Sequence, residues 1–219
     1  MDSEQLRHKY NEAFKSPVDK LSVNCPTLAK NIALSMIKKL PKNLKSEKKL
    51  KLLDIGCAKG FISEAFRVAG FEVHGIDYSD VAIDISKKQF PKCRFTHMDA
   101  FNPSFDEKFD VIFCKGFSGS NTHDIKFVAD FSNKYIDFLN EGGVLIISSI
   151  SNFRDEINPT KTWRYWNYNQ INELSGLIKN AKKINFYIPE KFYNFKFLID
   201  KLLNKKPKET NFYIFYQKI

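Results

Sequence analysis

Arginine is scarce in this sequence, although the chain is strongly basic. The formal net charge is +10, and the cationic residues are thirty lysines against five arginines. Arginine forks onto phosphates and stacks on bases, so its scarcity argues against a nucleic-acid groove despite the charge. We interpret the lysines from Lys38 to Lys51 as a solvated face, and for those from Lys179 to Lys208 an acidic partner stays open.

Long apolar runs are missing as well. The longest uncharged apolar run, Gly142 to Phe153, falls well short of the roughly 20 residues that a membrane-spanning helix needs. The first ten residues lack the apolar core of a signal peptide. We therefore expect a cytoplasmic protein with no membrane insertion.

Cysteine spacing excludes the usual metal and redox motifs. The four cysteines lie far apart, form no C-x-x-C pair and have no ligand spacing with the four histidines. Cys57 falls in a turn, whereas Cys93 and Cys114 fall at predicted strand positions. We expect buried thiols of a reduced protein and no metal site.

A dinucleotide-binding signature is absent from the most informative segment, Lys51 to Phe66. This segment predicts an apolar strand, a glycine-containing turn and a helix, an arrangement that gathers free backbone N–H groups around one concavity. A G-x-G-x-x-G turn that begins at Gly56 would need glycines where Ala58 and Phe61 stand. Instead Asp54 precedes the first glycine by two residues. That acid suits a ligand with a cationic amine better than one with a pyrophosphate.

The turn resembles the first motif of the class I S-adenosylmethionine-dependent methyltransferases, [D/E]-x-G-x-G-x-G. Asp54, Gly56 and Gly60 match it, while Ala58 stands where that family has its central glycine. The resemblance implies that S-adenosylmethionine is the cofactor. It also implies that the residues of this turn bind it, Cys57 included.

Further segments match the same family in the correct order between Leu50 and Ile150. Asp77 ends a second predicted strand, where doubly wound sheets bind ribose hydroxyls, and Tyr78 is placed to lie against the adenine. Asp99 ends a third strand, where this family has an acid that accepts from the adenine amino group. The resemblance therefore implies a set of cofactor-binding residues outside the turn, namely Asp77, Tyr78, Asp99, Ala100 and Cys114.

The fourth and fifth strands complete the resemblance. Phe109-Asp110 introduces the fourth, and Leu139 to Ser149 resembles the family's glycine-containing lead into the fifth. The segment Thr162 to Ile188 resembles the tail of small-molecule methyltransferases, and Asn211 to Ile219 is predicted as the last strand of a reversed hairpin.

The expected fold class follows from this order of elements. Alternating strands and helices imply an α/β fold, a doubly wound parallel sheet with helices on both faces. The resemblance implies the Rossmann-like methyltransferase form of this fold, a mostly parallel seven-stranded sheet with an antiparallel C-terminal edge hairpin. Length favours a single domain over residues 1–219, with an N-terminal helical cap at 1–45 and the core at 46–219. Helices are predicted at Ser3 to Phe14, at Pro26 to Leu40 and at Asp124 to Leu139, the last burying Phe127 among other apolar residues.

One histidine is a candidate general base. His123 lies in the loop after the fourth strand, at the carboxyl end where such sheets bind ligands, although a place near the next helix cap is the alternative. His74 and His97 fall within strands and suit core or strand-surface positions. His8 lies in the first helix and is expected to face solvent.

Two groups of aromatic residues are candidates for the substrate site. Tyr10 and Phe14 lie in the N-terminal helix, which often closes over the cofactor in the enzymes that this chain resembles. Trp163, Arg164 and Trp166 follow the fifth strand and are placed to line a pocket or to pair with an acidic group. The alternative is that they pack the following helix against the sheet.

The predicted function is S-adenosylmethionine-dependent methylation of a small molecule, such as a sugar or another secondary metabolite. Oxygen is the favoured acceptor atom, with nitrogen next. Cys114 to Phe117 lacks the [D/N/S]-P-P-[Y/F/W] signature of nucleic-acid amino-methyltransferases, which disfavours base N-methylation and leaves hydroxyl, carboxyl and other acceptors open. An RNA methyltransferase is one alternative. A catalytically silent protein of the same fold, which binds the cofactor or a partner, is the other. The oligomeric state is not predicted.

Overall fold

The computed structural model describes residues 3–15, 25–44, 48–117, 119, 122, 124–151, 166–189 and 210–219. The chain divides into two compact units. The first comprises Met1–Phe113 and Phe138–Val144, and the second comprises Cys114–Asp137 and Leu145–Ile219.

The first unit carries most of the predicted cofactor-binding residues. Its elements are α1 (Ser3–Lys15), α2 (Pro26–Lys39), the short 3-10 helix η1 (Lys42–Leu44), β1 (Lys51–Ile55), α3 (Phe61–Val68), β2 (Glu72–Asp77), α4 (Asp80–Gln89) and β3 (Arg94–His97). The strands β4 (Phe109–Lys115) and β5 (Leu139–Ser151) begin in this unit and end in the second. The second unit also holds α5 (Ile125–Asp137), α6 (Tyr168–Leu177), β6 (Ala181–Tyr187) and β7 (Thr210–Lys218).

The strands form a seven-stranded sheet in the order β3-β2-β1-β4-β5-β7-β6. β1 pairs in parallel with β2, and β2 with β3, whereas β6 and β7 pair antiparallel at the edge. This arrangement confirms the predicted fold class. Parallel strands end at the same edge of a sheet. The turn after β1 and the residues after β2 and β3 therefore lie at one edge, at the ends of neighbouring strands.

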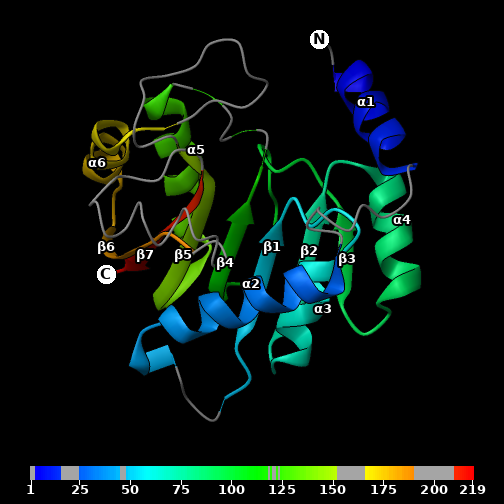
Figure 1. Cartoon of the computed structure of the whole chain (residues 1–219), viewed down its shortest axis with the longest axis horizontal. Helices are drawn as coiled ribbons and strands as arrows, with labels where there is room; N and C mark the ends of the chain where they lie inside the picture. Colours follow the sequence, from blue (N-terminus) through cyan, green and yellow to red (C-terminus); the bar gives the residue numbers. More distant parts are fainter. Residues whose placement is uncertain are drawn as a thin grey trace, which may run out of the picture. The chain divides into compact units, whose positions relative to one another are not determined.

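The helices of the first unit cover its strands. α2 packs against α3 through a buried face that includes Ala29, Ile32 and Met36, and Pro26 occupies its first turn, where a missing N–H does no harm. α1 instead contacts α4, which Figure 1 shows beside β2 and β3. The helix α2, which lies within the predicted N-terminal cap at 1–45, therefore belongs to the layer of helices that covers the strands of the first unit. The boundary at residue 45 stays a prediction.

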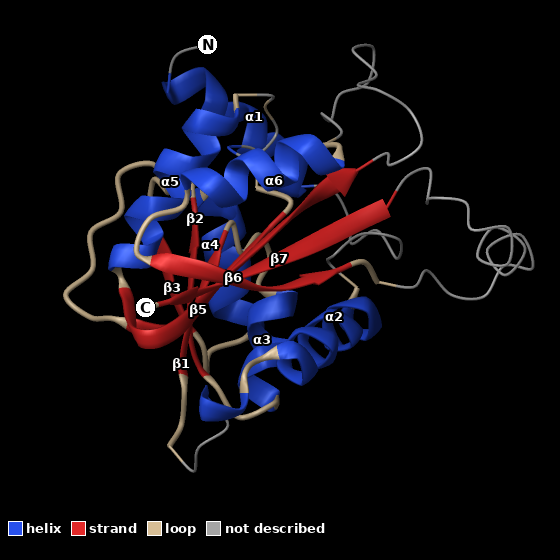
Figure 2. Cartoon of the chain, turned by 90° about the vertical axis from the view of Figure 1, so that its left-hand side faces the viewer, coloured by secondary structure: helices blue, strands red, loops and turns tan. Residues whose placement is uncertain are grey.

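Apolar packing dominates the second unit. In α5 the side chains of Val128, Phe131 and Tyr135 are buried, and the last two rings lie 4.8 Å apart. Phe127 is 43% exposed, so the prediction that it is buried was wrong. Successive helical residues point about 100° apart, which turns Phe127 away from the face that begins at Val128. Figure 2 shows β6 and β7 side by side, as their antiparallel register requires.

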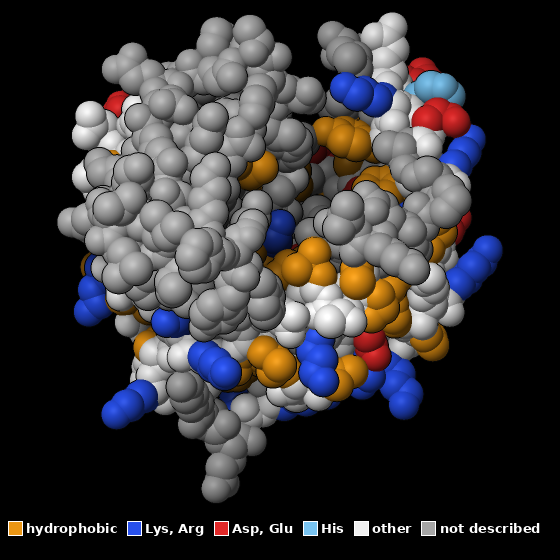
Figure 3. All heavy atoms as spheres, viewed as in Figure 1, with side chains coloured by type: hydrophobic (Ala, Val, Ile, Leu, Met, Phe, Trp, Pro, Cys, Tyr) orange, Lys and Arg blue, Asp and Glu red, His pale blue; other side chains and the backbone are white. Residues whose placement is uncertain are grey.

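Three of the cysteines are buried, as the sequence predicts. Among the described helices, none combines the length and the apolar character that crossing a lipid bilayer would require. Cys57, Cys93 and Cys114 are buried as predicted, although Cys93 lies just before β3 and not within it. On the face drawn in Figure 3, the lysine and arginine side chains stand apart from one another.

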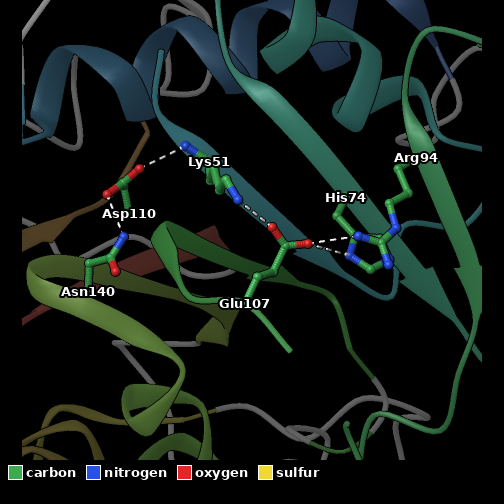
Figure 4. Close-up of polar contacts among 6 residues, drawn as sticks. All are labelled: Lys51, His74, Arg94, Glu107, Asp110 and Asn140. Carbon is green, nitrogen blue, oxygen red and sulfur yellow. Dashed lines mark hydrogen bonds and ion pairs between the residues drawn. The ribbon is translucent and has the colours of Figure 1, made fainter. Parts of the chain in front are cut away.

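One buried carboxylate ties together the starts of three strands. Asp110 of β4 is 7% exposed; its Oδ2 accepts from the Lys51 amide at 2.8 Å and its Oδ1 from Nδ2 of Asn140 at 2.8 Å (Figure 4). The backbone at Gly143 passes close by, where a β-carbon would lie 2.8 Å from the Asn140 oxygen. The acid that the sequence matched to a family signature therefore fixes β1 against β4 and β5 within the first unit.

Candidate functional site

The turn after β1 is held against β2 by its backbone. The amides of Gly56 and Cys57 both donate to the Ile76 carbonyl at 2.9 Å, and the Gly60 amide donates to the Cys57 carbonyl at 2.9 Å. Gly56 has φ 69° and therefore adopts the left-handed conformation that glycine tolerates. Burial raises the pKa of the Cys57 thiol well above its usual range, so this thiol stays protonated and serves as a small apolar group.

Gly60 begins α3 at a place where no side chain would fit. Its φ is 82°, and a β-carbon would lie 2.8 Å from Cζ of Phe95 and 3.0 Å from Cβ of Ser86. No side chain caps this helix start among the described hydrogen bonds. The first amides of α3 are therefore presented without a side-chain acceptor, which suits a ligand with electronegative atoms.

Ala58 stands at the position of the family's central glycine and adopts a backbone conformation that glycine tolerates. Its φ is 51°, in the left-handed region that a β-carbon disfavours by about 1–2 kcal/mol. The Ala58 amide donates to Oδ2 of Asp77 at 2.9 Å. Asp77 therefore binds the turn through the backbone of this alanine.

Asp77 lies at the end of β2 and binds two backbone amides. Besides the bond from Ala58, its Oδ1 accepts from the Ser79 amide at 2.9 Å. Burial raises the pKa of this carboxyl, and the bonds from Ser79 and Ala58 oppose the shift. A carboxylate offers about four lone-pair sites, so Asp77 keeps acceptor capacity for a ligand hydroxyl.

Asp54 belongs to β1 and is more deeply buried than Asp77. It is 3% exposed, and its Oδ2 accepts from the hydroxyl of Ser63 at 2.6 Å. Burial raises the pKa of Asp54 to about 7; the Ser63 bond opposes this shift and the Asp77 charge adds to it. A cationic group bound beside such a carboxyl would favour its charged form. Ser63 carries no motif signal, and the sequence analysis missed it.

The loop after β3 is ordered by its own acid. β3 ends at His97, earlier than predicted, and Asp99 follows as part of a turn. Its Oδ1 accepts from the Phe101 amide at 2.9 Å and its Oδ2 from Nδ2 of Asn102 at 2.8 Å. Ala100 between them is buried at 6% exposure. The Asp99 carboxylate thus holds this loop after β3.

Tyr78 and His97 join the loops that follow β2 and β3. Nε2 of His97 lies 2.9 Å from the carbonyl oxygen of Tyr78, and the two rings are 6.1 Å apart. His97 is exposed, as expected of a strand-surface histidine. The ring of Tyr78 is therefore held near the Asp77 loop, although its predicted contact with adenine stays a prediction.

The N-terminal helix attaches beside Asp77. The Ser79 hydroxyl donates to Oδ1 of Asn11 at 2.6 Å and accepts from the Ala82 amide, which caps α4. Tyr10 and Phe14 of α1 are half-buried. The sequence indicated that this helix could approach the cofactor loop but gave no signal for Asn11, whose partner lies 68 residues away.

Several predicted site residues lie elsewhere. His123, Trp163 and Arg164 are outside the described residues. Cys114 belongs to the second unit, where it is 1% exposed in β4. Trp166, also in the second unit, is 2% exposed, and its ring centroid lies 6.2 Å from that of Phe212. Their roles at a cofactor or substrate site stay predictions.

Lys115 is a half-buried lysine that the sequence analysis did not single out. It is the last residue of β4, and burial lowers the pKa of its amine. A lysine with a lowered pKa can serve as a general base nearer to neutral pH.

Within the described part of the chain, no three His, Cys, Asp or Glu side chains are grouped so as to hold a metal ion.

Comparisons with known proteins agree with this geometry. The model of a family described as a methyltransferase domain matches residues 46–206. A ubiquinone biosynthesis O-methyltransferase from Rhodopseudomonas palustris (strain BisA53) is 30% identical over 103 residues, which are 44% of this chain and 40% of that protein. The chain thus aligns with about two fifths of that relative's length.

Solved structures resemble the fold over nearly the whole chain. The magnesium protoporphyrin IX methyltransferase of Synechocystis PCC 6803, solved with bound S-adenosylmethionine, has a TM-score of 0.66 at 13% identity, covering 100% of this chain and 98% of its own. The [4+2]-cyclase SpnF has a TM-score of 0.65 at 14% identity, covering 100% and 97%. At these identities the likeness concerns the fold alone.

Proposed function

The chain belongs to the methyltransferase-domain family, and from this premise we propose that it uses S-adenosylmethionine to methylate an oxygen of a small molecule. The observation that carries the proposal is the acid-first turn. Asp54 is buried beneath it, Asp77 binds its Ala58 amide, and its backbone is held in conformations that glycine favours. This combination suits a ligand that carries both a cationic amine and ribose hydroxyls.

The residues of the first unit fit such a cofactor. Asp77 retains acceptor capacity for ribose hydroxyls, and Asp54 is a buried carboxyl whose charged form a bound cation would favour. The bare start of α3 at Gly60 offers amide donors. We assign the binding role to Asp54, Gly56, Cys57, Ala58, Gly60, Asp77, Tyr78, Asp99 and Ala100.

The chemistry asked of the chain is modest. When bound, the cofactor supplies a methyl group on a positively charged sulfur, already activated for displacement. The protein must mainly hold the acceptor in line at short range, which contributes through orientation. A hydroxyl acceptor also benefits from a general base, and His123 or Lys115 is proposed for that role.

Two features favour a small-molecule acceptor. The 30% identical relative is named as an O-methyltransferase of ubiquinone biosynthesis, and the scarcity of arginine opposes an RNA groove. A second candidate is a protein of this fold that binds the cofactor or a partner without transferring a methyl group; the [4+2]-cyclase SpnF, which has a similar fold, is named for a different activity.

The test has a binding arm and a transfer arm. Calorimetry on the purified chain should give tighter binding of S-adenosylmethionine than of NAD or ATP. Incubation with methyl-labelled cofactor and a metabolite extract, followed by mass spectrometry, should then reveal a labelled small molecule. Tighter NAD binding contradicts the proposal, binding without any transfer favours the silent alternative, and label in added RNA favours the RNA methyltransferase.

A further inference from the structure

A cavity lies at the opposite ends of the strands from the cofactor turn. Lys51 opens β1 and Glu72 opens β2, whereas Asp77 ends β2. The cavity at these strand starts has a volume of about 420 Å³. A neighbouring cavity of about 330 Å³ shares its lining residues His74, Arg94 and Glu107. All of these residues belong to the first unit, so the cavity is formed within one compact unit.

Positive charge exceeds negative charge in the lining of the larger cavity. Five cationic side chains line the cavity beside two carboxylates, and one of the five, Arg67, is already paired with Glu64, whose Oε2 lies 2.6 Å from its Nε, so two positive charges remain in excess. The cations are Lys49, Lys51, Arg67, Lys92 and Arg94, and the carboxylates are Glu72 and Glu107. Such a surplus around a hollow of this size favours a compact anion.

The ion pairs in the lining leave part of this charge unused. Oε2 of Glu107 pairs with Nζ of Lys51 at 2.7 Å, and Oε1 pairs with Nη1 of Arg94 at 2.8 Å. Figure 4 shows Glu107 between these two cations, so a single carboxylate serves both. In the described part of the chain, Lys49 and Lys92 form no ion pair with a carboxylate within 4.0 Å.

A buried histidine contributes to the lining of the cavity a ring nitrogen that has no hydrogen-bond partner. His74 of β2 is 4% exposed, and its Nε2 lies 2.9 Å from Oγ1 of Thr96. Its Nδ1 has no hydrogen-bond partner and lies 4.0 Å from Oε1 of Glu107. Burial, with the nearby Arg94 charge, lowers the pKa of His74 to about 4. The ring is therefore neutral at pH 7, and when Thr96 donates to Nε2 the proton resides on Nδ1, which becomes a donor without an acceptor.

We propose that this cavity is an anion-binding site for a compact phosphate polyanion, with pyrophosphate as its simplest member. Lys49 and Lys92 supply charge that the fold leaves unpaired, and Arg94 supplies a planar guanidinium that suits phosphate oxygens. The volume lies within the range of small-molecule pockets. The anion competes with Glu107 for Lys51 and Arg94. The site does not depend on methyl transfer, since it lies at the other ends of β1 and β2.

Calorimetry on the full chain with sodium pyrophosphate at about 0.15 M NaCl tests the site, because surface attraction is largely screened at that salt concentration. Saturable binding is expected. The Lys49→Ala/Lys92→Ala variant should weaken it about tenfold or more. Lys87→Ala/Lys88→Ala is the matched control, because it removes the same charge from exposed positions of α4 outside the cavity. Absence of binding, or equal weakening by both double variants, overturns the proposal.

Glu107→Gln supplies a test of opposite sign. This variant removes the carboxylate that competes with the anion, so pyrophosphate binding should become several-fold tighter. A thermal scan establishes that the variant folds; if it does not, the lysine variants decide. Unchanged or weaker binding by a folded variant overturns the proposal. Tighter binding of a single-stranded RNA oligonucleotide than of pyrophosphate also overturns it, and assigns the charge to nucleic acid.

Discussion

The carboxylate of Asp77 accepts a hydrogen bond from the backbone amide of Ala58 at 2.9 Å. An acid at the end of β2 thereby fixes the conformation of the turn that follows β1. The same carboxylate holds the Ser79 amide at the start of the α4 segment. Asp77 is therefore both the proposed ribose acceptor and the residue that shapes the neighbouring part of the cofactor site.

Substitution of Asp77 should weaken both cofactor binding and folding. Asp77→Ala removes two proposed ribose hydrogen bonds, each of about 0.5–1.5 kcal/mol or more for a charged acceptor, so affinity should fall about ten- to a hundred-fold. It also leaves the Ala58 and Ser79 amides without their acceptor, which lowers the free energy of unfolding by about 1–3 kcal/mol. Calorimetry and urea denaturation measure the two effects.

The exposed Asp84 of α4 offers a matched control, since Asp84→Ala removes the same charge without touching the turn. It should leave affinity and stability nearly unchanged. A dissociation constant for Asp77→Ala equal to that of the unaltered chain would mean that Asp77 is not at the ribose.

The sequence predicted the elements that local patterns encode. The acids at 54, 77 and 99, the glycines of the turn and the antiparallel final hairpin were predicted from the resemblance of ordered segments to a known family. It did not predict contacts set by register between distant strands. Asn11 accepts from Ser79, Ser63 donates to Asp54, and Cζ of Phe95 lies 2.8 Å from where a β-carbon at Gly60 would stand. None of these residue types signals its partner, because the partner is chosen by how the strands and helices pack.

The dependence on packing also explains why the burial of Phe127 was wrongly predicted and why Glu107 was not found from the sequence. Phe127 is an apolar residue of an amphipathic helix, and for that reason the sequence predicts it to be buried. The rotation of about 100° between successive helical residues instead places it outside the packed face. Glu107 precedes β4 in a stretch without a motif, yet pairing with Lys51 of β1 and Arg94 of β3 brings it to the cavity wall. Such clusters become visible only when three strands are placed side by side.

Ala58→Gly should stabilise the protein slightly or leave its stability unchanged. The variant relieves a left-handed alanine, which is disfavoured by about 1–2 kcal/mol, but adds about 0.5–1 kcal/mol of backbone entropy loss on folding. Gly60→Ala is the comparison of opposite sign, because a β-carbon there would meet Phe95 and Ser86 at 3.0 Å or less. It should lower the unfolding midpoint clearly. Urea denaturation of both variants measures this, and a marked loss of stability in Ala58→Gly would contradict the conformational argument.

Asp54 should make the unfolding free energy depend on pH. Its pKa is raised by burial from 3.8 to about 7, so the folded state binds this proton more tightly than the unfolded state. The stabilisation is fully present below about pH 4 and is lost as pH rises through about 7, by up to about 1.4 kcal/mol per pH unit. Other carboxylates also titrate, so the informative quantity is the difference between the unaltered chain and Asp54→Asn, measured by urea denaturation from pH 4 to 8. A difference that does not change over this range would contradict the buried carboxyl.

Chelators should leave methyl transfer intact. Hard divalent cations need several oxygen ligands, and within the described residues no cluster of three such side chains is found. Initial rates should therefore be equal before and after dialysis against EDTA. Loss of activity that added Mg²⁺ or Ca²⁺ restores would show that a metal takes part.

The proton acceptor can be assigned by comparing His123→Ala with Lys115→Met. If His123 removes the acceptor proton, His123→Ala should lower turnover about a hundred-fold or more with little change in cofactor affinity. The rate of the unaltered chain should then rise with pH through about 6.5, the ordinary pKa of histidine. If Lys115 acts instead, its lowered pKa places the rise below the usual range of lysine, and Lys115→Met abolishes that rise. His8→Ala, at an exposed position of α1, is the matched control. A less than few-fold effect in both variants would leave positioning of the acceptor as the source of catalysis, and failure of His123→Ala to fold would assign that residue to the helix start.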